Sequence, residues 1–195
     1  TITATMSAAD GDDVTVVIGT SGTGTEGTDY ANISDITISA GDTTGTATFD
    51  PTDDSVYEGN ETAIVAITGV TSSGSATESG TQSETITITE DDSAPTVTLS
   101  TSASSIAENS LSTLTLTATL SNATTEDVTV ALGTSGTGTE GTDYANISDI
   151  TISAGGTTGT ATFDPTDDSV YEGNETAIVA ITGVSGGSAT ENGTQ

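Results

Sequence analysis

The chain has 195 residues, with 29 Asp and Glu, no Lys, Arg, His, Cys or Trp, and a formal net charge of −29. This charge excludes nucleic acid and anionic membrane surfaces as direct partners, because both are bound through Lys and Arg. Without cysteine the chain forms no disulfides, so its rigidity must come from packing, hydrogen bonds or bound metal.

The strongest pattern in the sequence is an internal repeat with an offset of 114 residues. Gly19 to Val70 recurs at Gly133 to Val184, and the one difference is that Asp42 corresponds to Gly156. A repeat of this length predicts two copies of one domain. We expect a first module at residues 1–92 and a second at residues 93–195.

Short segments in which apolar residues alternate with Thr predict β-strands along the whole chain. No segment has the 3.6-residue period of a helix. Short strands at this spacing, separated by Gly-, Ser- and Asp-rich breaks, predict an all-β fold of tandem seven-stranded Ig-like Greek-key β-sandwiches. The expected strands begin near Thr1, Val14, Ser34, Thr43, Thr62 and Glu84 in the first module and cover Pro95–Ser100, Leu114–Leu120, Val128–Leu132, Ser148–Ser153, Thr157–Phe163 and Thr176–Thr182 in the second.

The repeat predicts that neither module is complete within this sequence. The first module would lack its first strand, because the chain starts inside the strand-like run Thr1–Met6, and the second would lack its last. Each module would then have an open sheet edge, which is a site of strand pairing. Continuation of the polypeptide in both directions is the favoured expectation, and strands supplied by neighbouring subunits are the alternative.

One loop of the repeat carries an unusual density of negative charge. The segment from Asp50 to Thr62 contains five carboxylates and recurs unchanged at Asp164 to Thr176. Two carboxylates about 4 Å apart repel by roughly 4 kcal/mol at an effective dielectric constant near 20. No cationic side chain can offset this repulsion, so the loop must spread apart, take up protons or bind metal. The alternative is that the loop is solvated surface that keeps an acidic protein soluble.

Several motifs in fixed order resemble the Calx-beta family. They are Gly27–Tyr30 (Gly-Thr-Asp-Tyr), Ala40–Gly41, the acidic stretch Asp53–Glu61, the triplet Glu90–Asp92, and the Glu of Ile106–Asn109. The resemblance covers almost the whole chain. It implies β-sandwiches that bind Ca²⁺ at one end through loop carboxylates.

The resemblance also implies which residues hold the metal. The first module lacks a counterpart of Glu108, and the second lacks the final acidic triplet. Glu61 and Glu175 are expected to hydrogen-bond the backbone of the turn instead of binding metal. The expected Ca²⁺ ligands are Asp29, Asp53, Asp54, Glu58, Glu90, Asp91 and Asp92 in the first module and Glu108, Asp143, Asp167, Asp168 and Glu172 in the second.

The sequence favours a structural or adhesive function over catalysis. The chain has no His, Cys or Lys for acid–base or nucleophilic chemistry, so we expect no enzyme activity. The favoured hypothesis is an extracellular repeat protein that forms a filament, sheath or adhesin stalk, with Ca²⁺ stiffening the joints between modules. Its partners would be divalent cations and further copies of the repeat, without nucleic acid or membrane insertion. The alternative is a calcium-responsive binding or adhesion module of a larger cell-surface protein.

Overall fold

The computed structural model describes residues 1–193, and this part of the chain contains β-strands and connecting loops but no helix. The predicted all-β fold is confirmed. Accordingly, residues 1–193 contain no helix of the length and hydropathy needed to cross a membrane. The chain divides into two compact units, one formed by Thr1–Asp54 and Gly59–Glu90 and the other by Ser55–Glu58 and Asp91–Gln195.

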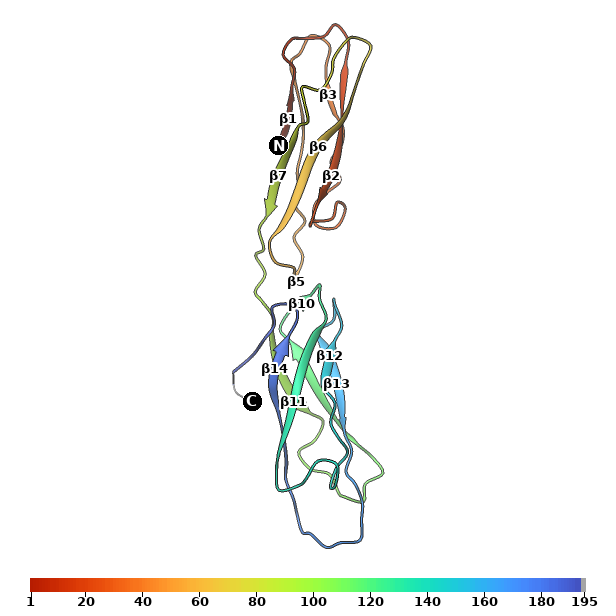
Figure 1. Cartoon of the computed structure of the whole chain (residues 1–195), viewed down its shortest axis with the longest axis vertical. Helices are drawn as coiled ribbons and strands as arrows, with labels where there is room; N and C mark the ends of the chain where they lie inside the picture. The colour runs from red at the N-terminus through yellow and green to blue at the C-terminus, as the bar shows by residue number, and fades with distance from the viewer. Residues whose placement is uncertain (194–195) are drawn as a thin grey trace. The chain divides into compact units, whose positions relative to one another are not determined.

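The first unit contains a four-stranded sheet and a two-stranded sheet. In the larger sheet the strand order is β3-β2-β6-β7, and the smaller sheet pairs β1 with β4. All neighbouring strands in both sheets are antiparallel (Figure 1). The strands are β1 (Ile2–Thr5), β2 (Val14–Gly22), β3 (Ile36–Ile38), β4 (Thr44–Ala47), β6 (Glu61–Ser72) and β7 (Ser83–Ile88).

The second unit is a sandwich with strand order β13-β9-β8-β15 in one sheet and β12-β11-β14 in the other. A short parallel pair of β5 with β10 also belongs to this unit. The strands are β5 (Val56–Tyr57), β8 (Thr96–Thr101), β9 (Leu114–Leu120), β10 (Ala123–Thr124), β11 (Val128–Gly136), β12 (Ile150–Ile152), β13 (Thr158–Phe163), β14 (Ala177–Ser185) and β15 (Thr190–Glu191).

The alternation seen in the sequence produces the core of each unit. In β12, Ile150 and Ile152 are completely buried while Thr151 between them is exposed. Val128 and Val130 of β11 are also completely buried and pack into the same core cluster. Successive side chains of a strand point to opposite faces, so apolar residues line the interior and Thr covers the outside.

Strands β2 and β11 extend beyond their predicted ends. Both continue through Gly-Thr-Ser-Gly to Gly22 and Gly136, where the sequence suggested a break. Gly22 has a φ of 125°, and a Cβ there would collide with the backbone carbonyl oxygen of Thr62. Glycine is therefore required because the neighbouring strand passes directly over it, and the same holds for Gly136.

Candidate metal centre

A buried tyrosine places the aspartate of the Gly-Thr-Asp-Tyr motif next to the acidic loop. Tyr144 is 2% exposed and stacks on Phe163 with 4.8 Å between the ring centroids. Tyr144 also forms a β-bridge with Pro165, and the backbone N–H of Thr166 donates to the carbonyl oxygen of Asp143 at 3.0 Å. This anchor fixes the start of the acidic loop against Asp143.

The carboxylate of Asp143 is held by its own loop. The backbone N–H of Thr139 donates to Oδ2 of Asp143 at 2.6 Å. The first unit repeats this arrangement, with the N–H of Thr25 donating to Asp29 at 2.6 Å and Tyr30 packed on Phe49 in a tilted pair with 5.0 Å between the ring centroids. Both Asp side chains are therefore held in place by hydrogen bonds from the backbone of their own loops.

The second unit brings five carboxylates together, which we call the acidic cluster: Glu108, Asp143, Asp168, Glu172 and Glu175. Each of two overlapping sets offers three oxygens within 4.8 Å of one another. One set is Glu108, Asp168 and Glu172, and the other is Asp143, Glu172 and Glu175. Glu172 belongs to both, so a single side chain links the two sets.

The spacing of these oxygens suits calcium. Ca²⁺ binds six to eight oxygens at 2.3–2.6 Å, so ligands on opposite sides of the ion lie roughly 5 Å apart. Three oxygens within 4.8 Å of one another are therefore close enough to contact the same ion. The cluster offers only carboxylate oxygens. Such hard donors suit Ca²⁺, whereas many transition metals favour nitrogen or sulfur ligands.

Electrostatic repulsion is visible in the carboxyl groups of the cluster. The pKa of Glu172 is raised, first by loss of surrounding water and then by the charges of Asp143, Asp168, Glu175 and Glu108. Burial, followed by the charge and hydrogen bond of Asp143, also raises the pKa of Glu175. A bound cation would offset the charge repulsion that contributes to both shifts.

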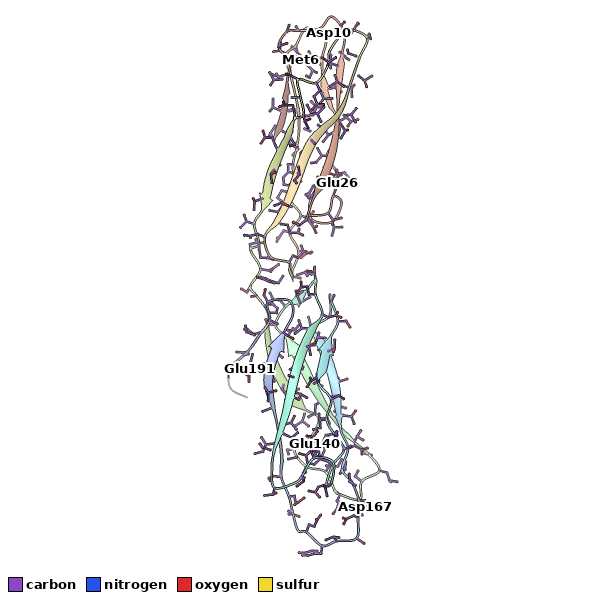
Figure 2. The ribbon with its side chains drawn as sticks, viewed as in Figure 1. Met6, Asp10, Glu26, Glu140, Asp167 and Glu191 are labelled. Carbon is purple, nitrogen blue, oxygen red and sulfur yellow. The ribbon has the colours of Figure 1, made fainter. Side chains whose placement is uncertain are left out.

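The cluster contains four of the five ligands predicted for the second module and adds one. Asp167 lies in the same loop but in neither set; it and Glu140 are near the same end of the unit (Figure 2). The addition is Glu175, for which the sequence suggested a bond to the turn. Glu175 and Asp143 are 32 residues apart in the chain, so the sequence does not show that they are close. The fold brings them together just before the start of β14.

In the first unit three carboxylates interact. The pKa of Glu61 is raised by burial, then by Asp29, with Glu90 contributing more weakly. Glu90 is fixed by two hydrogen bonds, accepting from the N–H of Gly59 at 2.7 Å and donating its own N–H to Asn60 Oδ1 at 2.9 Å. Carboxylate oxygens of Asp29 and Glu61 lie within 4.8 Å of each other, and the charge of Glu90 also acts on Glu61.

The other predicted ligands of the first module are distributed over both units. Asp53 and Asp54 lie in the first unit, before the segment Ser55–Glu58. Glu58, Asp91 and Asp92 belong to the second unit. These five residues stay predicted ligands.

Another pair of acidic residues has a purely structural position. Glu140 accepts hydrogen bonds from the N–H of Ile147 at 2.6 Å and the hydroxyl of Thr134 at 2.8 Å. These bonds lower the pKa of Glu140, the one from Ile147 having the larger effect. Glu26 makes the same contacts in the first unit, so this carboxylate braces the loop before each Asp ligand.

Comparisons with known proteins divide the chain between two domain models. The Calx-beta domain model matches residues 2–92, and the LapA domain model matches residues 91–192. Among solved structures, the chain is similar to the crystal structure of CBD12 from CALX1.2, with 17% identity, a TM-score of 0.41 and coverage of 84% of this chain and 66% of that one. It is also similar to the calcium binding domain CBD12 of CALX1.1, with 16% identity, a TM-score of 0.40 and coverage of 94% and 73%. No curated protein matches.

Proposed function

The chain belongs to the LapA domain family through its second half and carries a Calx-beta domain in its first half, and from this we propose that it is a calcium-binding part of a large cell-surface adhesin. Both domain types are non-catalytic modules of adhesion and calcium binding. An extracellular location accords with them, because millimolar calcium outside cells suits exposed carboxylate sites of modest affinity.

The observation that carries this proposal is the acidic cluster of the second unit. Two sets of three oxygens share Glu172, and its pKa is raised by loss of surrounding water and then by neighbouring charges. No Lys, Arg or His exists in the chain to neutralise them. A divalent cation bound by these oxygens would neutralise part of the negative charge of the cluster.

We further propose that calcium has a mechanical role in a stalk or filament. The triplet Glu90–Asp92 contains predicted ligands and also leads from β7 (Ser83–Ile88) to β8 (Thr96–Thr101). Calcium held by this triplet would restrict rotation of the segment that joins the two modules. The protein would then be stiffer with calcium than without it.

Calorimetric titration of the full chain with CaCl₂ tests calcium binding, and small-angle scattering with calcium or chelator tests stiffening. We expect saturable binding and a longer, less flexible particle with calcium. The matched control replaces Asp91 and Asp92 with Asn, which should abolish the stiffening while the second unit still binds calcium. Identical scattering in calcium and chelator would exclude the mechanical role, and no heat of binding would exclude the calcium site.

A second candidate function is a calcium-responsive binding module that leaves assembly to other parts of the protein. The LapA domain match favours adhesion in general and does not choose between stalk and binding module. Electron microscopy of the purified chain in calcium separates the two functions. Ordered fibres support the filament, whereas particles that stay monomeric support the binding module.

A further inference from the structure

The chain contains several Asn-x-Ser/Thr motifs, the acceptor sequence for N-linked sugars, and the function proposed above does not explain them. They begin at Asn32, Asn60, Asn122, Asn146, Asn174 and Asn192. The motif of Asn192 ends at Thr194, outside the described residues. An enzyme that transfers a sugar must reach both the Asn side chain and the hydroxyl group two residues later. The structure therefore decides which motifs can be used.

Three of the motifs within residues 1–193 have a hydroxyl residue that is already engaged or buried. The hydroxyl of Thr62 is hydrogen-bonded to that of Thr23 at 3.4 Å. Its counterpart in the second unit, Thr176, is bonded to Thr137 at 3.3 Å. Thr124 is 2% exposed, so an enzyme cannot reach it. The two motifs that remain begin at Asn32 and Asn146.

The loop before β12 presents both parts of the Asn146 motif to the surface. The backbone N–H of Ala145 donates to the carbonyl oxygen of Asp164 at 2.9 Å, which holds the start of the loop. Ile147 is half-buried and packs against the core of the second unit. Asn146 and Ser148 lie on either side of Ile147 and are both exposed, as alternate residues of an extended segment are. One enzyme can therefore contact the two side chains together.

The loop before β3 in the first unit has the same arrangement. The backbone N–H of Ala31 donates to the carbonyl oxygen of Asp50 at 2.8 Å. Ile33 is half-buried, whereas Asn32 and Ser34 on either side of it are exposed. The same pattern of one inward and two outward side chains therefore occurs once in each unit.

We propose that Asn32 and Asn146 are attachment sites for N-linked sugars, with Ser34 and Ser148 as the hydroxyl residues that the transferring enzyme recognises. The co-substrate is a sugar activated through a phosphate group. The motif is typical of surface loops in secreted proteins, and both loops meet this condition. The inference goes beyond calcium binding, because neither Asn belongs to the acidic cluster.

The chemistry at Asn146 is a substitution at the anomeric carbon of the sugar. The side-chain nitrogen Nδ2 forms a bond to this carbon, and the bond from the carbon to the phosphate oxygen breaks. The phosphate group leaves with the electron pair of that bond, and Nδ2 gives up one proton to a base of the enzyme. The product is a neutral amide that carries the sugar, so the charge of the chain does not change.

Mass spectrometry of the full protein, purified from the cells that naturally produce it, tests the inference. A glutamyl endopeptidase is suitable because it cuts after Glu, whereas trypsin has no site in this chain. It releases residues 27–58 and 141–172, each with one motif, and Asp42 in place of Gly156 separates the two by mass. We expect both fragments to carry the mass of at least one sugar. Two unmodified fragments would overturn the inference, as would equal modification of the motifs at Asn60, Asn122 and Asn174.

Variants produced in the same cells test recognition of the motif. Asn146→Gln and Ser148→Ala should each remove the sugar from residues 141–172 and leave it on residues 27–58, whereas Ser148→Thr should keep both. A sugar that stays on Asn146 in Ser148→Ala would contradict recognition through the hydroxyl. Asn174→Gln is the matched control and should change neither fragment. Calcium binding should be unchanged in Asn146→Gln, so this test and the calcium titration can fail independently.

The size of the attached group identifies the source of the sugar. An enzyme that uses a nucleotide-activated sugar adds sugars singly, whereas a membrane enzyme transfers an oligosaccharide already assembled on a lipid carrier. One sugar, or a series of masses that differ by one sugar, indicates the first source. A single larger mass on both fragments indicates the second. Either result supports the two attachment sites.

Discussion

Replacement of Glu172 with glutamine removes the carboxylate that the two sets of the acidic cluster share. Each set of three carboxylates that includes Glu172 is reduced to two, while the size of the side chain is unchanged. The number of charged ligands sets calcium affinity over several orders of magnitude, so we expect a loss of about 100-fold.

The size of the effect follows from ligand linkage. At a free calcium concentration of 100 times the dissociation constant, calcium stabilises the folded state by about 2.7 kcal/mol. For a domain of about 100 residues this raises Tm by roughly 11–22 °C. After a 100-fold loss the same calcium concentration equals the dissociation constant, and the gain falls to about 0.4 kcal/mol. Differential scanning calorimetry in calcium and in chelator measures both values.

Asp167→Asn is the matched control for this experiment. Asp167 lies in the same loop and loses the same charge, but it belongs to neither set of close carboxylates. We expect it to keep most of the calcium-dependent rise in Tm. If Asp167→Asn and Glu172→Gln reduce the rise in Tm equally, calcium binding depends on the total negative charge of the loop. That result would refute the conclusion that calcium binds at the close carboxylates around Glu172.

Three further predictions concern stability. Tyr144→Ala should destabilise the second unit by about 3–5 kcal/mol in urea unfolding, because it removes the buried ring stacked on Phe163; a loss under 1 kcal/mol would contradict its role as anchor. Ile150→Ala should cost about 2–5 kcal/mol in the same assay, since Ile150 is completely buried, and an unchanged midpoint would refute this. In chelator, the raised pKa values of Glu172 and Glu175 predict that their contribution to stability is complete below the usual carboxylate pKa and decreases as pH rises through the raised values. Thermal unfolding followed as the pH rises above 4.5, the ordinary value for a glutamate, should show this decrease, and saturating calcium should suppress it.

Much of the acidic cluster was predictable because the motifs that resemble the Calx-beta family are short and local. Asp143 and Tyr144 are neighbours in sequence, and the structure uses them together: the tyrosine is buried and the aspartate is presented to the acidic loop. Glu108, Asp168 and Glu172 were also predicted and lie in one set. When the residues of a short motif lie in one loop, their relative positions can be predicted from the sequence without knowledge of the fold.

The role of Glu175 was not predictable in the same way. It follows the acidic stretch by only three residues, yet its position near Asp143 depends on where β14 begins relative to the Gly-Thr-Asp-Tyr loop. Asp167 shows the opposite case, since it is adjacent to Asp168 but outside both sets. Neighbouring residues of an irregular loop point in different directions, and the sequence does not encode which ones converge.

Composition and periodicity alone determined the class of this protein. Alternation of apolar residues with Thr specifies strands with one buried face, and the absence of cationic side chains leaves the acidic loop to metal or water. Only the tertiary structure decided that four other carboxylates lie around Glu172 and that the nearly identical strands β6 and β14 differ in exposure. Burial and charge repulsion depend on what lies next to a segment, so β6, which pairs with β7, and β14, which has no second partner strand within residues 1–193, differ in exposure although their sequences are nearly the same.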